Sequence, residues 1–484
     1  MLIASFQFAV FTLAVLAVYH KLPEKYQNVF LLIVSGAMIA LFSLEFALVF
    51  AVLTFANYWL SQRAERGMER AGLALWAGIA INITALVYFK YADFYIPYFV
   101  YYLKRAGITL EATTLIFVLP VGLSFFIVQA IAYLLDINRG VATPTKNWVS
   151  FALFMVYFPK LVSGPIERSR TLLAQLEKPR QTRKTVVGKG VVLILTGLVR
   201  KLVIADLLSS LIPDDLFSSP GSYNAAHLGL WLLVYAIVIY NDFAGYTAIV
   251  RGVSVWFGIE LSANFNTPYF ARNFSEFWQR WHITLSDWLR DYIFMPLTRR
   301  FLRMRLPRNH PVTAFLPPLA TMGVSALWHS AAPGMLVWGL LHGLYQIIER
   351  SLSLLRPGRP LDRQPIWLQS VSRLVVFILV VLAWVPFRMD LTTALVYWRT
   401  LFNLADWGDL PALGALPGMA FWIILVVLLV NLILDILEAR KGKMVYLKLP
   451  VLVRAILINC AVYAILAAYF LKLEAAPPFI YQGF

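Results

Sequence analysis

Two histidines, His282 and His329, are the residues of this chain whose type and placement best suit chemistry. His329 lies between two apolar runs, residues 312–328 and residues 335–348. A titratable ring is costly to bury there, so packing alone explains it poorly. Burial lowers the pKa of a histidine, and the neutral ring can take the proton from a hydroxyl that attacks an acyl thioester. Such general-base help is typically worth about 10²–10⁴ in rate, so we predict that His329 is functional.

The other histidines and the lone cysteine carry weaker signals. We predict a role for His282 as well, although its Arg–Trp–His context also fits an interfacial anchor. His342 lies between Gly339 and Gly343, a spacing that lets helices approach closely, and a hydrogen bond across a helix pair would explain it. Cys460 is the only cysteine, so no disulfide or thiolate metal site is possible, and we expect a small buried residue.

Motifs of the common hydrolases and nucleotide-binding enzymes are absent. The sequence contains no GxSxG, no GxxxxGK[ST], no HExxH and no group of neighbouring cysteines and histidines. Serine-hydrolase, P-loop and zinc-hydrolase chemistry therefore lack support, and we expect neither a metal nor a bound cofactor.

The elements that must position these histidines are membrane helices. Of the 484 residues, 60% are hydrophobic and 14% are charged, with a mean hydropathy of +0.71. Long, continuous apolar segments recur, and in hydrocarbon they must be helices because the backbone has to satisfy its own hydrogen bonds. We predict an all-α polytopic integral membrane protein of about 11–13 membrane helices. The predicted segments are 4–20, 27–43, 45–61, 71–89, 114–135, 148–163, 187–211, 225–249, 312–328, 334–349, 368–387, 418–437 and 450–472.

The charge distribution predicts the orientation in the membrane. The net charge is +17, and the basic residues gather between apolar segments while loops such as 206–222 are poor in them. This is the positive-inside pattern, so we expect the basic loops in the cytoplasm and no nucleic-acid partner. The absence of Lys and Arg before Lys21 indicates a first membrane helix rather than a signal peptide. The basic residues are Arg63, Arg66 and Arg70, then Arg168, Arg170, Lys178, Arg180, Arg183, Lys184 and Lys189, then Arg299, Arg300, Arg303, Arg305 and Arg308, and finally Arg440, Lys441, Lys443 and Lys448.

Two regions lack a clean membrane span. The predicted topology needs one segment that does not cross. Residues 148–166 are the best candidate, because Pro159, Lys160, Gly164 and Pro165 interrupt them. Residues 250–311 are aromatic and carry scattered polar side chains, so we expect re-entrant and interfacial helices there. We expect one domain over residues 1–484, with N-terminal helices in 1–110, a core in 111–390 that holds both histidines, and C-terminal helices in 391–484.

The histidine segments resemble those of a known family. FWQRWHITLSDWLRDYIFMPL (277–297) and SALWHSAAPGMLVWGLLHG (325–343) are similar to the signature of the membrane-bound O-acyltransferase (MBOAT) family. Within it they resemble the bacterial alginate O-acetyltransferase (AlgI-like) branch. Four further blocks agree with that branch: LPVGLSFFIVQAIAYLLDINRG at 119–140, YFPKLVSGPIER at 157–168, the segment 241–278 and LAWVPFR at 382–388. The resemblance spans nearly the whole chain.

This resemblance implies a fold, a reaction and partners. It implies helices around a central tunnel, with His329 as the essential catalytic histidine and His282 as its partner. The implied activity is transfer of acetyl from acetyl-CoA across the bacterial inner membrane to an exported polysaccharide such as alginate. Implied partners are the lipid bilayer, an extracytoplasmic SGNH-type acetyltransferase and the polysaccharide export machinery. Further substrate or tunnel candidates are Trp328, Trp281, Asn266, Asp291, Arg290, Ser286 and Asp242.

Two alternatives stay open at this point. The first is D-alanyl transfer to teichoic acid, as in the DltB-like branch of the same family; the longer chain and the 157–168 block favour the alginate branch. The second is a transporter, since broken helices and polar groups at mid-membrane also mark substrate pathways. Ser330 replaces the glycine usual after the catalytic histidine of the branch, which makes the acceptor less certain than the reaction.

Overall fold

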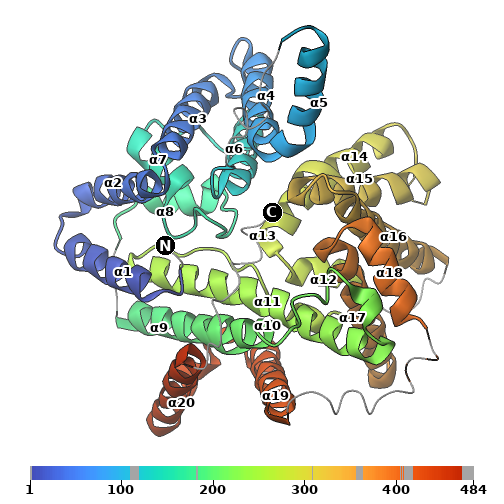
Figure 1. Cartoon of the computed structure of the whole chain (residues 1–484). Helices are drawn as coiled ribbons and strands as arrows, with labels where there is room; N and C mark the ends of the chain where they lie inside the picture. The colour runs from blue at the N-terminus through green and yellow to red at the C-terminus, as the bar shows by residue number, and fades with distance from the viewer. Residues whose placement is uncertain are drawn as a thin grey trace. The chain divides into compact units, whose positions relative to one another are not determined.

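The computed structural model describes residues 3–108, 119–180, 184–307, 309–355, 364–403, 405, 407 and 418–470. Over these ranges the chain is built of helices, without a strand (Figure 1). Its internal contacts divide it into two compact units. Unit 1 comprises residues 1–190 and 250–262, and unit 2 comprises residues 191–249 and 263–484. Whether the whole chain acts as one domain stays a prediction.

Unit 1 is assembled around α6, whose residues are nearly all buried. This helix packs against α3, α4 and α7. Polar side chains join apolar helices inside the unit, since Asn57 and Asn82 exchange amide hydrogen bonds of 3.2 and 2.7 Å between α3 and α4. The helices of unit 1 are α1 (Phe6–Tyr19), α2 (Glu24–Phe42), α3 (Leu44–Arg63), α4 (Ala71–Lys90), α5 (Ala92–Arg105), α6 (Leu123–Asn138), α7 (Trp148–Val156), the π-helical turn η2 (Ser169–Leu173) and α8 (Ala174–Leu176).

Unit 2 holds both predicted histidines and the C-terminal helices. Short helices occupy the aromatic region between α11 and α15, where no long span was predicted. The helices are α9 (Lys184–Leu198), η3 (Val199–Asp206), α10 (Leu207–Ser209), η4 (Pro220–Ser222), α11 (Ala225–Trp256), η5 (Pro268–Phe270), α12 (Phe274–Arg280), α13 (Ile283–Leu289), η6 (Arg290–Phe294), α14 (Met295–Arg303), α15 (Pro311–His329), α16 (Pro333–Leu355), α17 (Ile366–Arg388), α18 (Leu391–Leu401), α19 (Gly418–Lys441), η10 (Lys443–Lys448) and α20 (Val451–Phe470). Helices α9 and α11 begin in one unit and end in the other.

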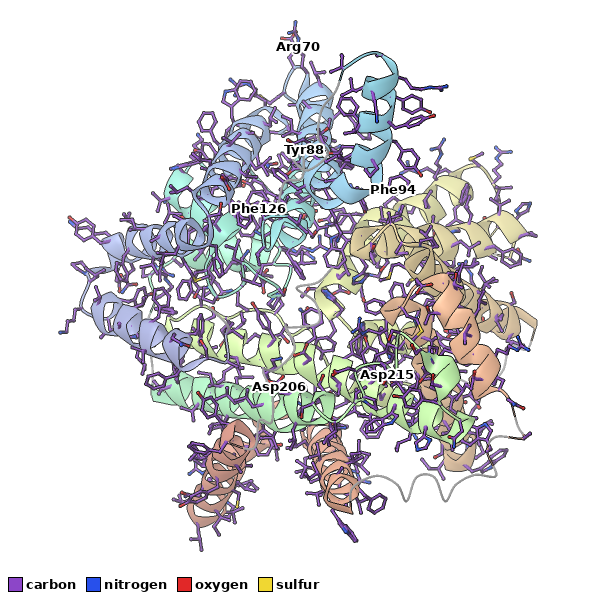
Figure 2. All side chains as sticks on the ribbon, in the orientation of Figure 1. Arg70, Tyr88, Phe94, Phe126, Asp206 and Asp215 are labelled. Carbon is purple, nitrogen blue, oxygen red and sulfur yellow. The ribbon has the colours of Figure 1, made fainter. Side chains whose placement is uncertain are left out.

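The helices have the length and composition of a polytopic membrane protein. Eight helices in the described part of the chain are long and apolar enough to cross a bilayer, and α1 and α6 are shorter apolar helices. Large apolar side chains also point outward, as lipid contact requires: Phe94 of α5 is 64% exposed, whereas Phe126 of α6 is 2% exposed (Figure 2). The predicted all-α membrane fold is confirmed.

Several predicted boundaries were wrong. The segment expected at 148–163 ends as a helix at Val156. With nine residues, α7 is too short to cross a hydrocarbon core of roughly 30 Å, which agrees with the prediction that this segment does not cross. Backbone turns follow, where proline and glycine interrupt the run. Helices α5 and α18 were not predicted, since their apolar residues are interspersed with polar ones. Residues 109–118, which include the first five residues of the segment predicted at 114–135, lie outside the described ranges.

The prediction that Cys460 is buried was also wrong. Its side chain is exposed on α20, as is that of Tyr463, which is 70% exposed. An apolar residue of a membrane helix can face lipid instead of protein, so its apolar context in the sequence does not imply burial within the fold.

Helices α15 and α16 form the closest helix pair of unit 2. A Cβ atom added to Gly339 would lie 2.7 Å from both Met322 O and Ala326 Cβ, and one added to Gly343 would lie 2.9 Å from Leu319 Cδ2. The two glycines therefore permit a backbone approach that any larger residue would prevent. The close packing predicted from the glycine spacing is confirmed.

A buried ion-pair network joins α19 to the π-helical turn η3. The Arg200 guanidinium lies 2.7 Å from Asp435 and 3.2 Å from Glu438, and it donates a 2.8 Å hydrogen bond to Asn241. Tyr240 donates a further bond of 3.1 Å to Asp435. Arg200 and both carboxylates are at least nine-tenths buried, so each charge depends on its partners for solvation.

We expect Asp435→Asn to destabilise unit 2. Removing one member of a buried ion pair costs up to about 3–5 kcal/mol, because the other charge stays buried. The matched control is Lys189→Gln, which breaks the more exposed pair with Glu260 and should cost about 0–1 kcal/mol. Thermal unfolding of both variants in detergent measures the difference. Equal melting temperatures would show that the buried pair does not hold α19 in place.

Candidate active site

His329 is the last residue of α15 and is 3% exposed. Three aromatic rings contact its ring edge to face: Trp328 at 4.8 Å, Trp338 of α16 at 5.5 Å and Phe387 of α17 at 5.4 Å between centroids. The His329 ring lies at the carbonyl end of α15. Aromatic side chains from α15, α16 and α17 thus surround this one histidine.

His282 lies at the start of α13, is 1% exposed and has a left-handed backbone with φ of +41°. This conformation is unfavourable for a residue with a side chain. It is held by two backbone hydrogen bonds, from Ile283 N to Asn264 O (2.9 Å) and from Ser286 N to the carbonyl of His282 (2.9 Å). Burial lowers the pKa of the His282 imidazole to about 3, so the ring is neutral at physiological pH.

Trp328 brings the two histidines together. Its ring contacts His329 at 4.8 Å and His282 at 6.0 Å, although the two histidines are 47 positions apart in the sequence. Phe243 of α11 covers the other side of His282 at 4.8 Å. The result is a buried site whose titratable rings lie among aromatic side chains, where electrostatic interactions are stronger than in water.

A short antiparallel pairing orients the segment that carries His282. The backbone N–H of Asn266 donates to the carbonyl of Arg280 at 3.0 Å, and the Ile283 bond to Asn264 lies next to it. The Arg280 guanidinium donates in turn to Asn266 O and to Thr267 Oγ1, both at 3.2 Å. The loop before η5 therefore fixes both sides of His282.

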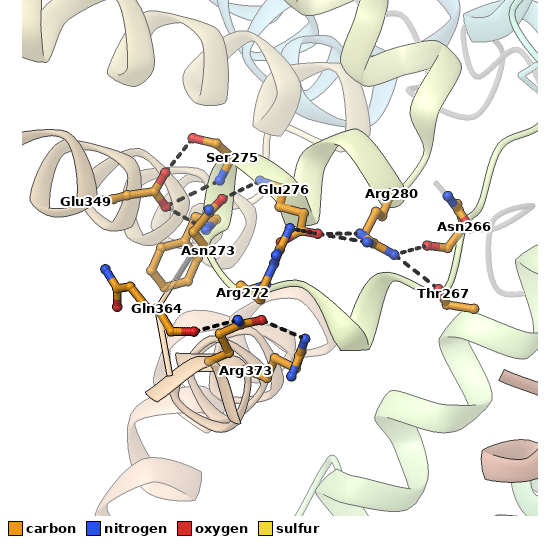
Figure 3. A network of polar contacts seen from close by, with 12 residues as sticks. Asn266, Thr267, Arg272, Asn273, Ser275, Glu276, Arg280, Glu349, Gln364 and Arg373 are labelled. Carbon is orange, nitrogen blue, oxygen red and sulfur yellow. Dashed lines mark hydrogen bonds and ion pairs between the residues drawn. The ribbon is translucent and has the colours of Figure 1, made fainter. Parts of the chain in front are cut away.

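Carboxylates support the same segment through α12 (Figure 3). Glu349 of α16 accepts hydrogen bonds from Phe274 N (2.6 Å) and from Ser275 Oγ (2.6 Å), which satisfies the free N-terminal end of α12. Glu276 lies between Arg272 (3.0 Å) and Arg280 (2.7 Å). Partial burial opposes ionisation of Glu276, but the hydrogen bonds from both arginines hold its pKa below the usual range.

The other predicted residues are divided between the site and its surroundings. Trp281 lies in the aromatic cluster, 4.8 Å from the Trp384 ring, and Ser286 Oγ donates to its carbonyl at 2.9 Å. Asn266 has an exposed side chain and joins the pairing through its backbone. Arg290 and Asp291 pair at 3.0 Å on the half-exposed turn η6.

Asp242 has a partner away from the histidines. Its carboxylate is 2.5 Å from the Lys201 ammonium, which also contacts Asp206 at 2.7 Å. The sequence neighbour Phe243 lies against His282 instead.

His342 continues the aromatic cluster one layer away from His329. Trp338 separates the two histidines, at 5.5 Å from His329 and 5.0 Å from His342. The hydrogen bond expected across the helix pair is not found: neither ring nitrogen of His342 has a hydrogen-bond partner in the described part of the chain. The histidine is enclosed by rings instead, among them Trp278 at 5.0 Å.

Unit 1 contains a polar cluster around Lys160, which the sequence identified only as an interruption of an apolar run. The buried Lys160 ammonium donates to Gln129 Oε1 at 2.7 Å beside a cavity of about 10 Å³, room for about one water molecule. Burial lowers the pKa of Lys160 to about 7, and the opposing charge of Glu167 offsets only part of this effect. Among the described residues there is no group of three or more His, Cys, Asp or Glu side chains placed to hold a metal ion.

Known proteins share these segments. Residues 142–387, which include both histidines, match the membrane-bound O-acyltransferase family. A "probable alginate O-acetylase" of Azotobacter vinelandii is 32% identical over 396 residues, 81% of this chain and 76% of that protein. A peptidoglycan O-acetyltransferase of Helicobacter pylori is 29% identical over 69% of this chain and 65% of its own length. A teichoic acid D-alanyltransferase of Streptococcus thermophilus is 29% identical over 47% of this chain and 56% of its own.

The family match covers the helices that bring aromatic rings to His329 and His282. The similarity to the alginate relative extends further, over 81% of this chain. Enzymes of this kind use an acyl donor and esterify a hydroxyl group. The chain belongs to the membrane-bound O-acyltransferase family and is a multi-pass membrane O-acyltransferase.

Proposed function

We propose that this protein transfers acetyl from acetyl-CoA, through the inner membrane, for O-acetylation of an exported polysaccharide such as alginate. The observation that carries the proposal is the contact of two buried histidines with one tryptophan, Trp328, inside the matched segment. His329 is the general base that takes the proton of the acceptor hydroxyl. His282, held neutral by burial, orients the reacting groups.

The acetyl donor is inferred from relatives and from charge. The relatives of greatest coverage are described as acetylating enzymes. Their descriptions support acetyl as the group transferred. The phosphates of acetyl-CoA suit the basic residues at the end of α14, which include Arg299, Arg300 and Arg303.

An enzyme that spans the membrane can take its acyl donor from one side and reach its acceptor on the other. Acetyl-CoA is made in the cytoplasm, whereas an exported polymer is modified outside, so we place a tunnel past the histidines. A partner of SGNH type would complete the transfer outside the membrane, together with the export machinery. D-alanyl transfer to teichoic acid is the second candidate function, because the teichoic acid D-alanyltransferase matches a smaller share of this chain than the acetylating relatives do. A transporter is set aside, since the chain belongs to an acyltransferase family.

We expect His329→Ala to lower the rate of acetyl transfer by about 10²–10⁴-fold, because the general base is lost. The assay follows labelled acetyl-CoA into polymer in membrane vesicles from a strain that carries only the variant chain. His282→Ala should lower the rate severely with some residual turnover. The matched control is His342→Phe, which keeps a ring among the same aromatic neighbours and should transfer at close to the wild-type rate. A folded His329→Ala protein with wild-type turnover would refute the mechanism.

Chain-length discrimination tests the acetyl assignment. One extra methylene in an apolar pocket changes the barrier by about 1–3 kcal/mol, so propionyl-CoA should react roughly 10- to 200-fold more slowly than acetyl-CoA. Trp328→Ala should narrow this ratio by enlarging the space beside both histidines, and Trp328→Phe should preserve most of it. Efficient palmitoyl transfer by the wild-type enzyme would contradict a short acyl pocket.

Accessibility labelling tests the proposed orientation. In a Cys460→Ser background, Arg303→Cys at the end of α14 should react with an impermeant maleimide only from the cytoplasm, and Asp214→Cys only from outside. Both positions are exposed, so a cysteine that is not labelled from the expected side lies on the other side of the membrane. Labelling of both from one side would exclude the two-sided arrangement.

A further inference from the structure

Asn264 is a buried amide held beside His282, with 1% of its surface exposed. Its backbone carbonyl accepts the hydrogen bond of Ile283, the residue that follows His282. Its side-chain oxygen accepts two bonds from Thr284, one from the backbone N–H (3.3 Å) and one from Oγ1 (2.6 Å). Because both donors reach the same atom, the amide orientation is determined: Oδ1 faces Thr284 and Nδ2 points away from it.

The amide nitrogen of Asn264 is an unused donor. Its Nδ2 is buried and has no hydrogen-bond partner in the described part of the chain. A buried donor without an acceptor costs free energy, so folded proteins rarely keep one without a reason. The next residue, Phe265, belongs to the aromatic cluster of the site, since its ring lies 5.1 Å from Phe243, which itself covers His282.

Neighbouring polar side chains are already engaged. The Thr284 hydroxyl is used by Asn264 itself, Ser286 Oγ donates to the carbonyl of Trp281, and the Arg280 guanidinium bonds Glu276 and Thr267. The side chain of the second asparagine in the loop, Asn266, is exposed. Asn264 is therefore the amide of this loop that is both buried and able to donate.

We propose that Asn264 is a catalytic residue whose Nδ2–H donates a hydrogen bond to the carbonyl oxygen of the acyl thioester as that oxygen becomes negative. The inference rests on the proposed function, in which His329 is the base of the same step. Hydrogen bonds hold Asn264 through both its backbone carbonyl and its side-chain oxygen, so its amide donor need not move when the negative charge develops. A donor that is already in place stabilises an oxyanion strongly.

The transfer proceeds by addition of the acceptor to the thioester and then loss of the thiol. The acceptor hydroxyl oxygen forms a bond to the thioester carbonyl carbon while its proton moves to the imidazole of His329. The carbonyl electron pair shifts to oxygen, where the Asn264 amide holds it. The pair then returns, the carbon–sulfur bond breaks, and the thiolate takes the proton from the imidazolium to leave as a thiol.

Paired substitutions at Asn264 test this role. Asn264→Asp keeps the acceptor for Thr284 but loses the donor, and Asn264→Ala loses both. Each should lower kcat by about 10²–10³-fold, the cost of removing one oxyanion donor. The KM for acetyl-CoA should change little, because the bond strengthens only in the transition state. The assay is labelled acetyl transfer in the same vesicles, with the melting temperature of each variant measured in parallel.

Thr284 supplies the matched controls. Thr284→Ser keeps the hydroxyl and should behave as wild type, whereas Thr284→Val releases the amide and should lower kcat by roughly 2- to 10-fold. Since Thr284 acts through Asn264, adding Thr284→Val to Asn264→Ala should cause no further loss of kcat. If Asn264→Ala folds poorly, Asn264→Asp and Thr284→Val still test the role, because neither contains that substitution.

The outcomes separate this inference from the proposed function. A folded Asn264→Ala enzyme with wild-type kcat, or one that loses only acetyl-CoA affinity, would overturn the role of Asn264. Independent, additive losses from Asn264 and Thr284 would also overturn it. If instead wild-type vesicles fail to use acetyl-CoA, or His329→Ala is fully active, the proposed function fails and not the assignment of the donor alone.

Discussion

Close packing of α15 against α16 is the constraint on which the site depends. Gly339 allows the two backbones to approach so closely that an added Cβ would meet Met322 O at 2.7 Å. This approach sets Trp338 of α16 against His329 at the end of α15. In lipid, association of apolar helices gains little from the hydrophobic effect, so small residues at the contact and good van der Waals packing decide the geometry.

The aromatic cluster and the polar network have separate physical tasks. Aromatic rings surround His282 and His329, and burial lowers the pKa of the His282 imidazole. Hydrogen-bonded carboxylates lie beyond the rings, where Glu276 and Glu349 hold α12. The site is thus positioned by polar groups that do not enter it.

Buried charges outside the site hold helices together. Arg200 joins α19 to η3 through Asp435 and Glu438, with all three groups buried. Buried ion pairs contribute little net stability compared with apolar packing, but breaking one is expensive. Through this network, α19, which lies outside the matched family segment 142–387, is joined to η3 within unit 2.

The sequence by itself determined the class of protein and most helices, because hydrophobic length is a local property. It also singled out the two histidines, whose catalytic role stays a prediction. It indicated that residues 148–166 do not cross the membrane, because proline and glycine interrupt them, but it placed the end of α7 too late. It was wrong about Cys460, because apolar character does not distinguish lipid from protein interior. Only the tertiary structure decided which side chains meet. Trp328 contacts both histidines, and Asn264 with Thr284 flanks His282. Arg200 pairs with Asp435 across 235 positions, and such pairings follow from helix packing, which no local pattern encodes.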